Sequence, residues 1–334
     1  MNNNYMGMNI ELLKNKWQSI EDTYNNDNPW VFIVLDEVCV PHLNIAINDK
    51  KNRCILLKTN SSSSQNIKTV IKENIKFSYS KVYKQFVLEL LDDSFLDLFD
   101  DLIISIYNKI HQETNDREAA SIFTDTIVKW MNFFIKGGND NLSESIIRGL
   151  FGELIVLKDY LTTLDKLHVN EVLKAWQGPY NSPTDFVFDN ALVEVKTKRS
   201  DASIVKISSE FQLEEVSGKS LILKVVSIET IEGSIATISS IFTEIKEVIR
   251  AKGGDLGIFM SAMNGLGINI STIKLYDHYC YTPNQIEDYD CLLEHEGLGF
   301  PKLVNASLPN QITKVKYDLN LHTLERYRIK LKEI

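Results

Sequence analysis

Three charged residues in one short stretch, Asp185, Glu194 and Lys196, have types and a spacing suited to metal-assisted phosphate chemistry. The intervening Asp189-Asn190 pair predicts the two-residue turn of a β-hairpin. In that register Asp185 lies opposite Glu194, and strand alternation places Lys196 on the same face. Opposed carboxylates repel unless a cation lies between them, and oxygen ligands favour Mg²⁺ or Mn²⁺. The pattern therefore predicts a divalent-metal site whose lysine orients or deprotonates water, or stabilises charge on a phosphate.

A simpler interpretation competes with this one, because an E-x-K pattern on an exposed strand is usually a solvated salt bridge. The opposed Asp185 favours the metal site, since like charges are rarely placed opposite each other without a reason. Asp185, Glu194, the backbone carbonyl of Val195 and waters are the predicted metal ligands, with Glu153 nearby as a further member of the site.

Two further polar residues are candidates for the same site. Glu153 lies at the edge of the apolar stripe of a predicted helix, where a carboxylate is costly unless it is paired. It could instead reach solvent or pair with a lysine. Gln212 lies in a predicted helix over residues 209–216, where it could reach the site or form a capping box with Ser209.

A net charge of −9 and a pI of about 5.3 do not attract nucleic acid to the chain as a whole. Binding to DNA would need a local basic patch, for which Lys198, Arg199 and Lys206 are the candidates, although such a run is more often a solvated charged surface. Trp176 could stack on a base, although packing against the core is the commoner role of such a residue.

Hydrophobic periodicity predicts the elements around these residues. The first third reads as β-rich and then helical, with strands over 31–35, 43–47, 53–57 and 81–91 and helices over 95–106 and 122–134. A Gly- and Asn-rich break at 136–141 predicts a domain boundary that separates residues 1–138 from 139–334. The second part is predicted to contain a helix over 142–161, a hairpin over 185–197, strands over 204–207 and 221–228, and a helix over 235–249.

Composition excludes several other classes of protein. The four cysteines show no C-x-x-C pair and no usual zinc spacing, so they are expected to be buried free thiols. Residues 1–17 lack a signal-peptide core and no stretch is apolar enough to span a membrane, so we expect a cytoplasmic location and no membrane partner. The nucleotide-binding G-x-x-x-x-G-K-[ST], the G-x-S-x-G and the H-E-x-x-H motifs are all absent.

The order of these motifs resembles the PD-(D/E)XK nuclease superfamily, and within it a bacterial family often encoded near restriction–modification and phage-defence genes. The similarity covers most of the chain and is carried by Gly152-Glu153-Leu154, Trp176-x-Gly178-Pro179, Thr184-Asp185-Phe186, Val193-Glu194-Val195-Lys196-Thr197 and Ile207-Ser208-Ser209-x-x-Gln212-Leu213. Thr184 separates Pro183 from Asp185, so the strict Pro-Asp pair is absent. The proline is the least chemical part of that motif.

The resemblance implies an α/β fold with a restriction-endonuclease-like core of helix, mixed β-sheet, helix and strand, preceded by an N-terminal β-rich and helical domain. It implies Asp185 and Glu194 as metal ligands, Lys196 as the catalytic lysine, Glu153 as an accessory acid and Gln212 as a polar position on a second helix. The first core strand has no firm place between residues 164 and 177.

Two functions follow. The first is an Mg²⁺- or Mn²⁺-dependent DNA endonuclease of a restriction or phage-defence system. The second is a catalytically silent, nuclease-like module that binds DNA or a partner in a multi-protein defence complex. The expected partners are DNA and other restriction or defence proteins. The sequence leaves open whether the chain forms a homodimer.

Overall fold

The computed structural model describes residues 8–24, 30–37, 39, 42–59, 69–137, 142–230 and 236–334. It shows a mixed α/β fold of two compact units, unit 1 over residues 1–137 and unit 2 over residues 138–334. The break predicted at 136–141 coincides with this division, although residues 138–141 lie outside the described ranges.

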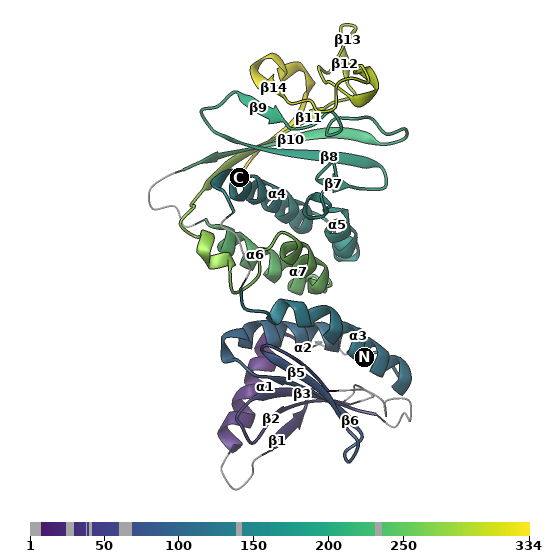
Figure 1. Ribbon diagram of the computed structural model, residues 1–334, viewed down its shortest axis with the longest axis vertical. Coiled ribbons are helices and arrows are strands. Elements are labelled where there is room, and N and C mark those ends of the chain that lie inside the picture. The colour runs from purple at the N-terminus through teal and green to yellow at the C-terminus, as the bar shows by residue number, and fades with distance from the viewer. Residues whose placement is uncertain are drawn as a thin grey trace, which may run out of the picture. The chain divides into compact units, whose positions relative to one another are not determined.

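Unit 1 contains a six-stranded antiparallel sheet in the order β1-β2-β3-β6-β5-β4, and three helices that pack beside it (Figure 1). Its elements are α1 (Ile10–Thr23), β1 (Val31–Val34), β2 (Leu43–Ile47), β3 (Arg53–Lys58), β4 (Val70–Lys72), β5 (Ile75–Ser80), β6 (Gln85–Leu90), α2 (Leu96–Ile110) and α3 (Asp116–Trp130). The β-rich and then helical character predicted for this part is confirmed. Helix α1 and strands β4 and β5 were not predicted from the sequence, and β6 begins four residues later than predicted.

Unit 2 is built on a separate five-stranded mixed sheet in the order β15-β11-β10-β8-β7, in which only β8 and β10 are parallel. Its helices are α4 (Glu144–Thr163), α5 (Val169–Ala175), α6 (Ile238–Ala251) and α7 (Leu256–Gly265). Its strands are β7 (Phe186–Val187), β8 (Ala191–Arg199), β9 (Ile204–Ile207), β10 (Ser220–Glu229), β11 (Thr282–Asp290), β12 (Glu294–His295), β13 (Leu298–Gly299), β14 (Tyr317–Asn320) and β15 (Arg328–Glu333).

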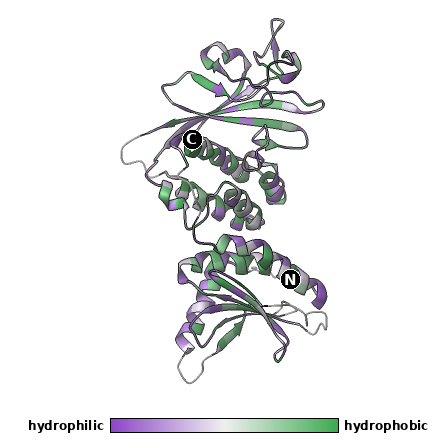
Figure 2. Ribbon diagram, viewed as in Figure 1, coloured by the Kyte–Doolittle hydropathy of each residue, from purple (hydrophilic) through white to green (hydrophobic). Residues whose placement is uncertain are grey.

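Helices α4 to α7 lie on one side of this sheet, and α4 packs directly against β8 (Figure 1). Apolar and polar residues alternate along α4 and α6, as expected for helices that bury one face (Figure 2). Since β10 is a central strand covered on both faces, residues 221–228 form the near-continuous apolar run of a buried strand.

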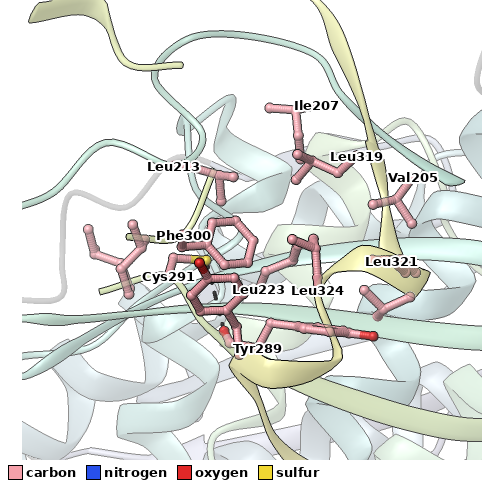
Figure 3. Packing of buried hydrophobic residues seen from close by; sticks show 14 residues of the cluster. Val205, Ile207, Leu213, Leu223, Tyr289, Cys291, Phe300, Leu319, Leu321 and Leu324 are labelled. Carbon is pink, nitrogen blue, oxygen red and sulfur yellow. Dashed lines mark hydrogen bonds between the residues drawn. The ribbon is translucent and has the colours of Figure 1, made fainter. Parts of the chain in front are cut away.

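The other side of the sheet is covered by the β9–β14 pair and the C-terminal segment. Their side chains form one buried cluster with β8, β10 and β11 (Figure 3), which comprises Leu192, Val205, Ile207, Leu213, Leu221, Leu223, Val225, Tyr289, Cys291, Phe300, Leu319, Leu321, Leu324 and Tyr327. Both faces of β8 are therefore buried over residues 192–195.

One local expectation was wrong, and the range in which the sequence placed no strand is partly helical. Residues 209–216 do not form a helix but a turn over 210–213, because buried Leu213 is drawn into the cluster. Residues 169–175, where a first core strand was sought, form α5, and the only strand-like pairing described next to it is an isolated bridge between Trp176 and Phe186.

The expected burial of the cysteines is confirmed for Cys39, Cys54 and Cys291, whereas Cys280 is half-buried. No helix in the described ranges is long and apolar enough to cross a membrane.

Candidate metal centre

The predicted hairpin register is confirmed. Phe186 pairs with Val193 and Val187 with Leu192, and the Phe188 N–H donates to the Ala191 carbonyl oxygen at 2.8 Å across the Asp189-Asn190 turn. The turn residues Asp and Asn set this register locally, as the sequence predicted. Continuing the register by one residue brings Asp185 beside Glu194.

Asp185 itself lies just outside β7 and is half-buried. One of its side-chain oxygens accepts the Val195 N–H at 2.7 Å, and its backbone carbonyl oxygen accepts the N–H groups of Gln177 and Gly178 at 2.7 and 3.0 Å. These bonds fix the Asp185 carboxylate against β8 at the level of Glu194.

Glu194 is fully buried, with 0% of its surface exposed. The Lys196 ammonium donates to Oε1 of Glu194 at 2.5 Å and to Oε1 of Gln212 at 3.1 Å. The same Gln212 oxygen accepts the Ser208 N–H at 2.7 Å. Gln212 thus reaches the site from a turn, which buried Leu213 anchors in the core, rather than from the predicted helix.

Glu153 reaches the same place from α4. Gly152 allows α4 to approach β8, since a Cβ atom on Gly152 would lie 1.9 Å from Oγ1 of Thr197. The neighbours of Glu153 were not predicted from the sequence: the indole N–H of Trp176 donates to its Oε2 at 2.8 Å, and Gly178 lies against it. Trp176 is fully buried, so it does not offer a face to a base.

The pKa values of all three carboxyl groups are raised, and Asp185 contributes to the rise at the other two. Burial, and then the nearby Asp185 carboxylate, raise the pKa of Glu153 to about 8, against the Trp176 N–H and the Lys196 ammonium. Burial raises the pKa of Asp185, against Lys196 and the Val195 N–H. Burial and Asp185 raise the pKa of Glu194 well above its usual range. One ammonium therefore faces three acids, which is a local excess of negative charge.

The donor set fits a divalent cation. Oε2 of Glu194 is buried without a hydrogen-bond partner, and a buried anionic oxygen of this kind is costly unless something binds it. Among the described residues, no group of three or more His, Cys, Asp or Glu side chains is arranged to hold a metal by itself. Backbone carbonyl groups and waters would therefore complete the coordination, as is usual for Mg²⁺.

The predicted basic patch does not share one surface. Strand alternation puts Lys198 on the Glu194 face of β8 and Arg199 on the opposite face. Arg199 also donates to Asp201 at 3.0 and 2.6 Å, which balances its charge locally. Lys206 is exposed on β9, opposite Asp318 of β14.

Comparison with known protein families gives a match over most of the chain. A family model described as "Putative PD-(D/E)XK family member, (DUF4420)" matches residues 13–322 of the chain. No curated protein and no solved structure matches it.

Proposed function

Because the chain belongs to this PD-(D/E)XK family, a superfamily that generally consists of nucleases, we propose that it is a divalent-metal-dependent DNA endonuclease. The observation that carries the proposal is the fully buried Glu194, whose free Oε2 lies in the field of Asp185 and Glu153 and whose Oε1 binds Lys196. A module that only binds DNA has no need of such a costly cluster.

Each residue of the site has its own role in the proposed reaction. Asp185, Glu194 and the Val195 carbonyl, with Glu153 as the accessory acid, would hold Mg²⁺ or Mn²⁺. When bound, the cation would supply Lewis-acid stabilisation of the charge that develops on the phosphate. Lys196, which is 15% exposed, would bring its ammonium to the scissile phosphate, where its charge acts mainly in the transition state. Lys198, which lies on the Glu194 face of β8, would contact the DNA backbone.

We place the enzyme in a restriction or phage-defence system, acting alone or with other proteins of that system. The net charge of −9 favours a partner that supplies part of the DNA affinity.

The test is plasmid nicking by the wild type, Lys196→Ala and Lys330→Ala, with Mg²⁺, with Mn²⁺ and with a chelator. Lys330 lies on the exposed edge strand β15, so it controls for the loss of a surface lysine. The wild type and Lys330→Ala should nick DNA only with the metal, and Lys196→Ala should be slower by about a hundredfold or more. Equal nicking by all three would assign the activity to a contaminant or another site. An absence of nicking, even with the products of neighbouring genes added, would favour the silent binding module.

A further inference from the structure

Trp176 contacts the proposed centre through its indole nitrogen, the single polar atom of its side chain. Its ring is fully buried and stacks on Phe259, with centroids 6.1 Å apart. A buried indole N–H requires an acceptor, and here the acceptor is Oε2 of Glu153 at 2.8 Å. The rigid ring thus fixes the position of a carboxylate that lies 23 residues earlier in the chain.

Gly178 borders the same carboxylate from the next turn. A Cβ atom there would lie 2.4 Å from Oε2 of Glu153 and 3.3 Å from Oδ1 of Asp185. Its φ lies outside the left-handed region, so the position requires space rather than an unusual backbone conformation. The bonds from Gln177 and Gly178 to the Asp185 carbonyl oxygen hold this segment in place.

Glu153 would not stay beside Asp185 without such support. When it is ionised, as a carboxylate beside a bound cation is, its side chain is repelled by Asp185 and would be displaced away from it. The indole bond opposes this displacement and occupies only one of the two carboxylate oxygens.

We propose that Trp176 and Gly178 are positioning residues that hold Glu153 in place beside the divalent cation. The inference rests on the proposed metal site and adds to it the residues that determine the place of its third acid. Outer partners of this kind typically change metal affinity by about 10- to 100-fold when they are removed.

The chain offers a matched control for Trp176. Trp17 in unit 1 is also buried, and its indole N–H also donates to a buried carboxylate, that of Asp100, at 2.8 Å. Mn²⁺ binding to the full chain is measured by calorimetry for the wild type, Trp176→Phe and Trp17→Phe. We expect a loss of about 10- to 100-fold in affinity for Trp176→Phe and none for Trp17→Phe.

A second pair of variants tests the same proposal without replacing a buried tryptophan, so its result does not depend on whether the Trp176 site accepts a smaller ring. Gly178→Ala places a methyl group against Glu153, whereas Gly149→Ala, one turn before Glu153 on α4, meets nothing within 4 Å. We expect weaker Mn²⁺ binding only for Gly178→Ala. In a Glu153→Gln background, Trp176→Phe should cause no further loss of affinity, because its effect passes through Glu153.

The results separate the two proposals. A wild type that binds no Mn²⁺ would overturn the metal site, and this inference with it. A wild type that binds Mn²⁺, with Trp176→Phe and Gly178→Ala equal to their controls, would overturn the positioning role alone. An additive loss in the Glu153→Gln background would also overturn it.

Discussion

The Lys196 ammonium lies 2.5 Å from a carboxylate oxygen of Glu194 that has no exposed surface. A buried pair of this kind repays its desolvation only when both partners are well bonded, and here the second acceptor of the ammonium is Gln212 at 3.1 Å. The Glu194 carboxylate keeps Oε2 without a partner. The pair therefore holds Lys196 in place while it leaves one carboxylate oxygen for a cation.

Gln212→Ala should slow DNA cleavage by roughly tenfold, because a hydrogen bond to a charged group contributes about 1.5 kcal/mol and Lys196 loses one of its two acceptors. Mn²⁺ affinity should hardly change. Cleavage rates and calorimetry for Gln212→Ala are compared with those for Gln18→Ala, an exposed glutamine of α1. Equal rates for both variants would show that the Glu194 contact alone positions Lys196.

Asp185→Ala should abolish measurable Mn²⁺ binding, because it removes one of the two principal carboxylates of the proposed site. Calorimetry on the full chain checks this, and Asp189→Ala in the exposed hairpin turn is the matched control. Unchanged binding after Asp185→Ala would rule the site out.

Gly152→Ala should destabilise the protein by about 1–3 kcal/mol, since its new methyl group meets Oγ1 of Thr197 at 1.9 Å and α4 must shift away from β8. Gly149→Ala on the same helix should instead stabilise it by about 0.5–1 kcal/mol, because the site is open and alanine favours helices. Urea unfolding of both variants measures the difference. Equal stabilities would mean that the helix and the strand can separate without cost.

Asp100 should make stability depend on pH below neutrality. Burial, opposed by Arg53 and Trp17, raises its folded pKa to about 6 from an ordinary value of 3.8. The folded state then binds a proton more tightly than the unfolded chain. This contribution is therefore fully present below pH 3.8 and is lost as the pH rises towards 6, by about 3 kcal/mol in total.

Unfolding of wild type and Asp100→Asn at several pH values tests this effect, with Asp93→Asn at an exposed position before α2 as the control. Between pH 4 and 6, the free energy of unfolding of Asp100→Asn should fall less steeply than that of the wild type. Parallel curves for the two proteins would contradict the raised pKa.

The sequence by itself determined the arrangement of Asp185, Glu194 and Lys196. A two-residue turn sets the hairpin register, and strand alternation with a period of two then decides which side chains share a face. Both rules act within about a dozen residues, so they hold before any tertiary contact forms. The long amphipathic helices and the sheet strands of unit 2 were predictable for the same reason.

Only the tertiary structure decided how these residues are surrounded. Glu194 is buried because residues 300–327, more than a hundred positions later, cover its face of β8. Trp176 finds its acceptor on α4, and Gln212 reaches Lys196 because Leu213 enters the core and prevents the predicted helix. Burial and partner choice depend on packing between distant segments, which local propensity and periodicity do not encode.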